Sequence, residues 1–225
     1  MIIGIIPAKS ISRRVPNKNF IIFNGKPMIA WTIQAAKKTK IFDQIIISTD
    51  SKNIIRKMSK YKVDYIIRPK KLNEEKYGID EVMRYSISKI KKKVKYVCCL
   101  FPSAPLMTSN DILNGFNKIK TNKYKYVFAG SNFSHPIEKS FKIINNKVKM
   151  VFSKNLMKRS SKTFSDTFHD IGYFYWANSN TWKNNNFCYD SNSSIIKIPN
   201  WRAQDIDTLD DLKKTDLIFK SLKKK

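Results

Sequence analysis

The chain has 225 residues, which suits one domain or one domain with a sizeable insertion, and its 42% of hydrophobic and 12% of aromatic residues are enough for a packed core. No apolar run reaches about 18 residues, which excludes a transmembrane helix. The short apolar run at the start does not fit a secretory signal peptide. We therefore expect a cytoplasmic protein with no membrane partner. The formal net charge of +27 attracts polyanions, but the lysines are scattered along the chain. This favours solvated surfaces over a nucleic-acid-binding stripe.

Strand, loop and helix alternate along the first hundred residues. Short runs of β-branched apolar residues predict buried strands at 2–6, 44–48, 63–67 and 95–101. Helical spacing of apolar residues predicts helices within 25–38, where Pro27 fits the first turn, and at 53–61 and 80–91.

This order predicts an α/β fold, namely a Rossmann-like, mostly parallel sheet with helices on both faces. Ligands of such sheets bind beyond the carboxyl ends of the strands. We therefore expect one crevice to be lined by the loops after Ile6, Ser48, Ile67 and Leu100.

The pattern changes after about residue 126. Strands are predicted at 127–129, 172–177 and 195–198, and a hairpin at 141–151 turns at Asn145-Asn146. Residues 153–167 are polar and irregular, and an acidic stretch leads into a terminal helix. We interpret residues 1–225 as a single domain.

Three cysteines occur, at Cys98, Cys99 and Cys188. The first two are adjacent in a predicted strand, so they should point to opposite faces. The spacing matches neither a metal site nor a disulfide framework, and we interpret all three as structural.

A basic loop, residues 7–19, directly follows the first strand. It carries Lys9, Arg13, Arg14 and Lys18. Cations at a strand end neutralise phosphate charge, and planar guanidinium groups match phosphate oxygens. The loop lacks the GxxxxGK[ST] spacing of a P-loop, so it predicts a phosphate site of another kind.

Two carboxylates, Asp205 and Asp207, alternate in the segment QDIDT. On an extended segment they share one face and could hold Mg²⁺ together with substrate phosphates. The alternative is that Asp207 or Thr208 only caps the last helix, and the motif alone leaves both open.

Two further segments carry polar groups. His169 and Asp170 precede the aromatic run GYFYW, where a lone histidine is more often packed than catalytic. Ser103 follows a buried strand within Pro-Ser-Ala-Pro, which presents it at the crevice, but this motif taken alone favours a plain turn.

Together these segments resemble the nonulosonic-acid cytidylyltransferases, which make CMP-activated sialic, legionaminic and pseudaminic acids from CTP. IIPAKSISRRVPNKN is similar to the family's IIPARGGSKRIPxKN loop, and the pairing of QDIDT with HDIGYFYW is the most specific part. The resemblance spans Ile2 to about Leu217 and is strongest with the pseudaminic acid branch. Phe101 stands where the sialic acid branch usually has glutamine.

The resemblance implies the nucleotide-diphospho-sugar transferase fold and transfer of CMP from CTP to the anomeric hydroxyl of a nonulosonic acid, with Mg²⁺ as cofactor and pyrophosphate as leaving group. It assigns catalysis to Lys18, Arg13 and Asp207, and the metal to Asp205 and Asp207. It assigns nucleotide binding to Ala8, Lys9, Ser12, Arg13, Arg14, Lys18, Asn19, Asp50 and Arg68. It assigns the sugar acid to Ser103, Lys139, Arg159, His169, Asp170 and Tyr175, with Lys139 and Arg159 facing its carboxylate.

The resemblance also implies that residues 130–168 form an insertion that reaches a partner subunit in a homodimer, where Arg159 could act in the neighbouring site. The product would serve surface-glycan or flagellin glycosylation. The alternatives are a CMP-legionaminic or CMP-sialic acid synthetase and, from another class, a basic nucleic-acid-binding protein.

One departure concerns the basic loop. The family's Arg-Gly-Gly is Lys9-Ser10-Ile11 here. Glycines let backbone amides approach phosphates closely, so the loop should have a different shape in this chain.

Overall fold

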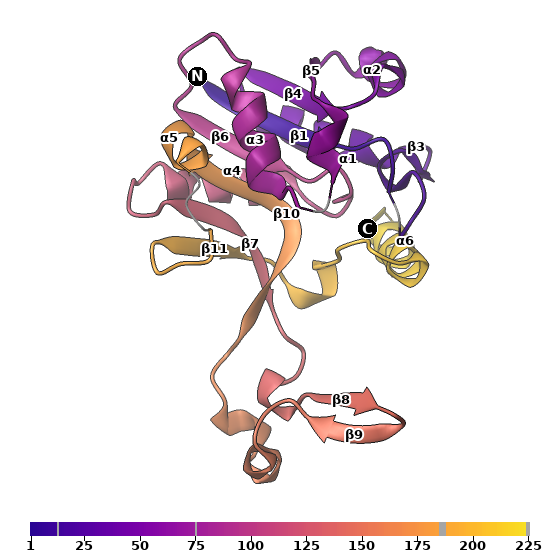
Figure 1. Ribbon diagram of the computed structural model, residues 1–225, viewed down its shortest axis with the longest axis vertical. Coiled ribbons are helices and arrows are strands. Elements are labelled where there is room, and N and C mark those ends of the chain that lie inside the picture. The colour runs from indigo at the N-terminus through magenta and orange to yellow at the C-terminus, as the bar shows by residue number, and fades with distance from the viewer. Residues whose placement is uncertain (13, 75, 185–187, 224–225) are drawn as a thin grey trace.

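The computed structural model describes residues 1–12, 14–74, 76–184 and 188–223. The described residues form a seven-stranded sheet with the order β11-β7-β10-β6-β1-β4-β5 (Figure 1). Its strands are β1 (Ile2–Ala8), β4 (Gln44–Thr49), β5 (Asp64–Ile67), β6 (Tyr96–Leu100), β7 (Tyr126–Asn132), β10 (Phe168–Asn178) and β11 (Ser193–Lys197).

The sheet is mostly parallel, as predicted. Strand β10 alone among these seven runs antiparallel, and it pairs with β6 on one side and β7 on the other. The pairs β1–β4, β1–β6, β4–β5 and β7–β11 are parallel. The predicted strand 172–177 is the inner part of β10, and neither its antiparallel direction nor its place between β6 and β7 is apparent from its sequence.

Helices cover both faces of the sheet, as predicted. They are α1 (Met28–Thr39), α2 (Lys52–Met58), α3 (Ile79–Ser88), α4 (Ser109–Ile119), α5 (Ser179–Lys183) and α6 (Leu209–Lys223). Short 3-10 turns are η1 (Lys18–Phe20), η2 (Ser59–Tyr61), η3 (Lys70–Asn73), η4 (Ile137–Lys139), η5 (Lys154–Lys158), η6 (Ser161–Thr163) and η7 (Asn200–Arg202). Two short strands, β2 (Ile22–Phe23) and β3 (Lys26–Pro27), pair before α1.

Two apolar cores, one on each face, account for this layering. Cys98 belongs to the core that packs against α1 and α4, and Cys99 belongs to the core that packs against α3. The prediction that these cysteines point to opposite faces is confirmed. Both thiols are free and fully buried, and burial raises their pKa well above the ordinary value.

Element boundaries differ slightly from the prediction. Strand β1 continues through Ala8, α3 ends at Ser88, and Pro27 precedes α1 rather than forming its first turn. Helices α4 and α5 were not predicted. Helix α4 begins with a capping box in which Thr108 accepts from the Asp111 amide while Asp111 accepts from Thr108.

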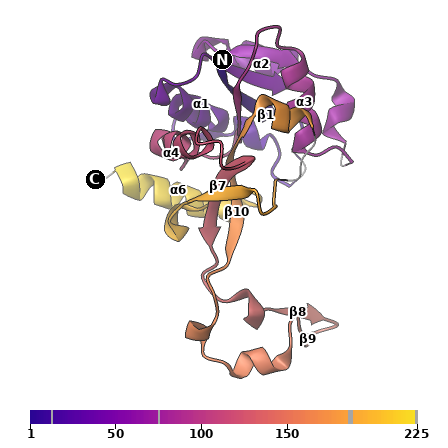
Figure 2. The same ribbon diagram turned by 90° about the vertical axis from the view of Figure 1, so that its left-hand side faces the viewer.

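Residues 133–167 leave the sheet between β7 and β10 and form an arm that projects from the rest of the molecule, here called the head (Figures 1 and 2). The arm carries the hairpin of β8 (Phe141–Ile144) and β9 (Lys147–Met150). Asn145 and Asn146 have φ angles of 50° and 58°, as a two-residue turn of this hand requires. The predicted hairpin and its turn are confirmed. None of the described helices is both long and apolar enough to cross a membrane.

Candidate active site

Two adjoining cavities lie at the carboxyl ends of β1, β5 and β6. The first, called the apolar cavity, has a volume of about 310 Å³ and is bounded by Arg68, by the start of α3 and by Phe101 to Ser103. The second, called the basic cavity, has a volume of about 350 Å³ and is bounded by Arg14, Val15 and Asp207. Four residues line both cavities: Lys9, Ser12, Lys18 and Asn73. The structure thus brings the loops after β1, β5 and β6 into one crevice, as predicted. The loop after β4, which was also expected there, contributes none of the described residues that line these two cavities.

The basic loop and the acidic segment meet in the basic cavity. The Arg14 guanidinium lies 2.7 Å from Oδ2 of Asp207, and Lys18 Nζ lies 3.2 Å from Oδ1 of the same carboxylate. Lys18 also donates to the Ile206 carbonyl at 2.5 Å. Without ligand, the cations predicted to bind phosphate therefore neutralise a carboxylate predicted to bind metal.

The base of the loop is anchored by hydrogen bonds rather than by glycine. Ser10 donates through its amide and its hydroxyl to the two carboxylate oxygens of Asp50, at 2.8 and 2.5 Å. Asn19, which is buried, donates to the Lys9 carbonyl at 3.3 Å. Burial opposes ionisation of Asp50, but the hydrogen bonds from Ser10, together with a bond from its own backbone and the charge of Arg68, outweigh burial and lower the Asp50 pKa. Ser10 therefore fixes the loop through Asp50, and Ile11 is 73% exposed.

Arg68 forms one wall of the apolar cavity and is only 4% exposed. Its guanidinium donates to the Ser48 carbonyl and, at 2.8 Å, to Oδ1 of Asn73. Burial lowers its pKa, and the Asp50 carboxylate opposes this effect. Its Nε is buried and has no hydrogen-bond partner among the described residues.

Gly172 lets Asp205 approach β10. Gly172 has a φ of +62°, and a Cβ added to it would lie 3.2 Å from Oδ2 of Asp205. Partial burial and the nearby charge of Asp207 raise the Asp205 pKa, while Lys18 opposes this. Two carboxylates that repel each other suit a divalent cation, which would relieve the repulsion.

The described residues contain no group of three or more His, Cys, Asp or Glu side chains placed to hold a metal ion. Asp205 and Asp207 could supply two oxygen ligands, and phosphate oxygens of a bound nucleotide could supply others. The residues present therefore fit a metal that arrives with its nucleotide.

A carboxylate and two phenols form a second polar cluster on the head. The Tyr175 hydroxyl donates to Oδ2 of Asp170, and the Tyr189 hydroxyl donates to the same oxygen at 3.0 Å. The Gly172 amide donates to Oδ1 at 3.0 Å. Burial raises the pKa of Tyr175, and the negative charge of Asp170 adds to this. The Tyr175 ring lies 5.7 Å from that of Phe101, which lines the apolar cavity, so this cluster adjoins the crevice.

Three of the remaining predicted residues lie away from the two cavities. His169 packs 4.8 Å from the Phe133 ring at the base of the arm. Lys139 lies in η4 and Arg159 follows η5, both within the arm, where Arg159 stacks on Phe164 at 5.0 Å. Within one chain the structure does not place these two cations at the crevice. Ala8 is buried at the end of β1, Ser103 lines the apolar cavity, and Arg13 lies outside the described residues.

Two residues of this site escaped the sequence analysis. Asn73 lines both cavities and orients Arg68, and Tyr189 completes the Asp170 cluster. Neither belongs to a charged motif. Asn73 lies in a polar turn and Tyr189 in a polar loop, so no sequence pattern distinguished them.

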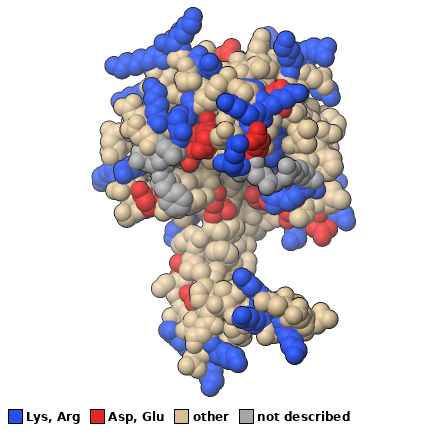
Figure 3. Space-filling model, viewed as in Figure 1, with Lys and Arg blue, Asp and Glu red and all other residues tan. Residues whose placement is uncertain are grey.

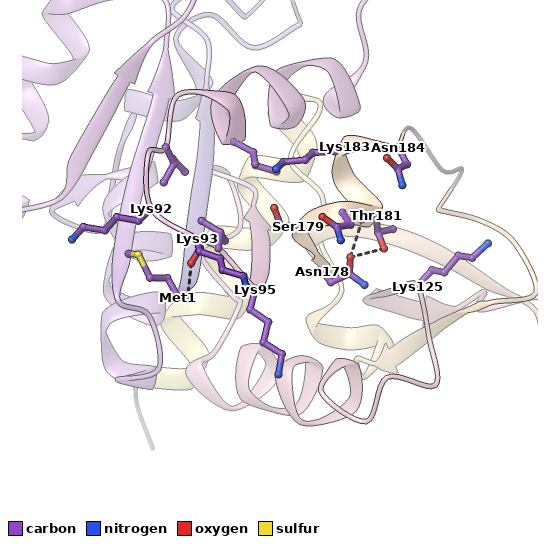
Figure 4. A pocket seen from close by; sticks show the side chains of 14 residues that line it. Met1, Lys92, Lys93, Lys95, Lys125, Asn178, Ser179, Thr181, Lys183 and Asn184 are labelled. Atoms are coloured by element: carbon purple, nitrogen blue, oxygen red, sulfur yellow. Dashed lines mark hydrogen bonds between the residues drawn. The ribbon is translucent and has the colours of Figure 1, made fainter.

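A larger cavity of about 820 Å³ lies at the opposite edge of the sheet (Figure 4). Lysines line it, but the side chains of Lys92, Lys95 and Lys125 extend in different directions around it. They do not converge on a common point, as binding of one compact anion requires. The crevice beside Asp207 is therefore the candidate active site.

The comparisons with known proteins agree with one another. The model of the cytidylyltransferase family matches residues 3–223. A pseudaminic acid cytidylyltransferase of Campylobacter jejuni subsp. jejuni serotype O:23/36 (strain 81-176) is 32% identical over 220 residues, covering 96% of this chain and 95% of the relative. A Helicobacter pylori protein named pseudaminic acid cytidylyltransferase and UDP-2,4-diacetamido-2,4,6-trideoxy-beta-L-altropyranose hydrolase is 30% identical over 91% of this chain and 40% of its own length.

Among solved structures, CMP:2-keto-3-deoxy-manno-octonic acid synthetase complexed with CTP has a TM-score of 0.72 at 13% identity. The match covers 98% of this chain and 99% of that chain. At this identity it shows a shared fold, and it confirms the predicted fold class.

Proposed function

The chain belongs to the cytidylyltransferase family, and we propose that it transfers CMP from CTP to the anomeric hydroxyl of a nonulosonic acid, with pseudaminic acid as the acceptor. The observation that carries this proposal is the meeting of the basic loop with Asp207 beside the apolar cavity. A nucleoside has an apolar face and polar edges, and a triphosphate needs cations, so the two cavities match the two ends of CTP.

In this proposal the base and ribose occupy the apolar cavity, which Arg68 and Ser103 line. The triphosphate occupies the basic cavity against Lys9, Arg14 and Lys18. The sugar acid lies between this crevice and the Asp170 cluster. Positioning and charge neutralisation then carry catalysis, with no covalent enzyme intermediate.

The chemical step is a single displacement at phosphorus. The anomeric oxygen forms a bond to the α-phosphorus, the bond from that phosphorus to the bridging oxygen breaks, and pyrophosphate leaves. Lys18 and Arg14, released from Asp207 by the nucleotide, stabilise the charge on the leaving phosphates. We assign acceptance of the hydroxyl proton to Asp207. When bound by Asp205 and Asp207, Mg²⁺ would neutralise further charge on the triphosphate.

The experiment that tests the activity measures pyrophosphate release from CTP and Mg²⁺ with separate pseudaminic, legionaminic and sialic acids. Release with pseudaminic acid alone supports the proposed acceptor. Release only with another sugar acid moves the chain to that branch, and no release with any of them refutes the proposal.

The alternative of a nucleic-acid-binding protein predicts a continuous basic surface. Figure 3 instead shows Lys and Arg side chains scattered over the head and the arm, with acidic side chains between them on the head. On this face the charge does not follow one stripe, which favours the enzyme.

We also propose that the chain is a homodimer joined through its arms. The arm exposes a set of large apolar side chains: Phe141, Ile143, Ile144, Val148, Val151, Phe152 and Met157. Ile143 and Val148 face each other across the hairpin and are 71% and 66% exposed. Large apolar side chains exposed in one segment are typical of an interface. In a dimer, the arm of one subunit could bring Lys139 and Arg159 to the sugar carboxylate in the other.

Replacing both Ile143 and Val148 with lysine should yield a monomer that binds CTP but has lost most of its turnover. Light scattering gives the mass, and the matched control replaces Lys142 and Lys149, which form the neighbouring cross-strand pair, with glutamine. A double-lysine variant that keeps the wild-type mass would refute the interface. A monomeric variant with full turnover would refute the shared site.

We assign the reaction to the cytoplasm, where CTP is available, and its CMP-sugar product to glycosylation of surface glycans or flagellin. Support for these two assignments comes from the proposed substrates alone.

A further inference from the structure

We propose that Arg202 is the positioning residue that holds Asp205 and Asp207 in place for the metal and the nucleotide. This inference rests on the proposed function. It concerns a residue outside every motif that pointed to the chemistry, and it follows from the contacts of its side chain and of its backbone.

The side chain of Arg202 is fixed by a buried carboxylate. Its Nη1 and Nη2 donate to the two oxygens of Asp111 at 2.5 and 2.9 Å. The two side chains are only 13% and 8% exposed. Such a two-point contact between planar groups fixes orientation as well as distance, which a lysine cannot do. The pair therefore gives the segment that follows Arg202 a rigid starting point.

Helix α4 does not need Arg202 for its cap. Asp111 already accepts from the amide and the hydroxyl of Thr108, at 2.8 and 2.7 Å. The arginine adds a connection from this cap to η7, which immediately precedes the acidic segment. It makes a second connection by donating to the Leu106 carbonyl at 3.1 Å, in the loop that carries Ser103.

The backbone of Arg202 is fixed from the opposite direction. Its carbonyl accepts from the Tyr173 hydroxyl, which belongs to β10. The neighbouring Gly172 is the residue that abuts the Asp205 carboxylate. Strand β10 therefore contacts η7 through the Arg202 carbonyl and the acidic segment through Asp205.

The acidic segment itself has no strand or helix to hold it, since residues 203–207 belong to neither. Its downstream end is held by the buried Ile206 side chain and by Asp211, which accepts from the Asp207 amide at 3.1 Å. Its upstream end depends on Arg202. Because a metal pair tolerates little displacement, loss of this upstream anchor should loosen the carboxylates.

The test measures metal binding without turnover. Mn²⁺ binding, followed by electron paramagnetic resonance with CTP present and no sugar acid, should be about tenfold weaker in Arg202→Lys, at the lower end for residues that orient metal ligands. CTP binding without metal should stay within about twofold of wild type, because Arg202 is not among the described residues that line either cavity. Arg202→Met should weaken Mn²⁺ binding further, and if it fails to fold, the lysine variant remains informative.

A control separates positioning from general stability. Trp182→Phe removes a buried hydrogen bond to the Val97 carbonyl on the far side of the sheet and should lower the melting temperature without changing Mn²⁺ binding. Unchanged Mn²⁺ binding in Arg202→Lys, or an equal loss in Trp182→Phe at a matched melting temperature, overturns the inference. If the variants give either of these results while the wild-type chain releases pyrophosphate, only the role of Arg202 is refuted and the proposed function stands. A wild-type chain that binds no Mn²⁺ with CTP loses the metal site itself, and with it this role.

Discussion

Replacing Asp207 with asparagine should change CTP binding in opposite directions in the absence and in the presence of Mg²⁺. In the free protein the Asp207 carboxylate competes with phosphate for Arg14 and Lys18. Without metal, the neutral amide releases both cations, so CTP should bind more tightly. With metal, the variant lacks one of two carboxylate ligands, so CTP should bind more weakly and turnover should nearly disappear.

The magnitude follows from the exposure of the two ion pairs. The Arg14 side chain is 71% exposed, so its pair with Asp207 contributes less than about 1 kcal/mol. The Lys18 side chain is 19% exposed and its pair is worth somewhat more, of the order of 1 kcal/mol. Together they predict a gain of about 1–2 kcal/mol, or about fivefold to thirtyfold tighter CTP binding without metal.

Isothermal titration of CTP into both proteins, first with a chelator and then with Mg²⁺, measures this change of sign. Asp210→Asn is the matched control, because Asp210 pairs with Lys213 at 3.7 Å on the exposed start of α6 and should change neither titration. Weaker CTP binding of Asp207→Asn in the chelator would refute the idea that Asp207 occupies the phosphate cations. Full turnover of this variant with Mg²⁺ would remove its assigned metal role.

Two further substitutions test the loops around the crevice. Gly172→Ala should lower turnover at least tenfold, because the new methyl group would meet the Asp205 carboxylate at 3.2 Å. Gly25→Ala is the control: Gly25 has a φ of +87°, so alanine there carries similar backbone strain of about 1 kcal/mol, but an added Cβ would have no atom within 4 Å. Equal losses of turnover in the two variants, measured in steady-state assays, would refute the steric reason. Ser10→Ala should remove about 1 kcal/mol of stability at pH 7, measured by urea unfolding. Ser10 lowers the Asp50 pKa in the folded state. The difference in stability between wild type and Ser10→Ala should therefore have its full value above the ordinary pKa of 3.8 and should shrink as the pH falls below it. A difference that stays constant down to pH 2 would contradict this origin.

Local sequence patterns predicted much of the first half of the fold. The runs that became β1, β4, β5 and β6 are short and β-branched, and turn residues separate them from amphipathic helices. Asn145-Asn146 predicted its hairpin for an equally local reason, because both residues tolerate the left-handed conformation that the turn requires.

The sequence did not predict the features that depend on distant contacts. The aromatic run of β10 is compatible with either strand direction, and only pairing with both β6 and β7 makes it antiparallel. In the candidate site, charge and spacing singled out Lys18 and Asp207. Tyr189 and Arg202 act through partners that lie 19 and 91 residues away in the chain, which local sequence patterns do not reveal. Asn73 acts through a partner only five residues away, but no charge or spacing pattern marks that contact.

The strand order also sets the sequence in which the sheet can assemble. β6, β1, β4 and β5 are contiguous in the sheet and are complete once residue 100 has been made. β7 is synthesised next, but its two neighbours, β10 and β11, both come later in the chain, beyond the whole arm. On the ribosome, the apolar residues of β7 must therefore wait with both edges unpaired until β10 emerges and inserts beside β6. Such long-range pairing slows folding and exposes strand edges to aggregation, so this step is where a chaperone would have most effect on the yield of folded protein.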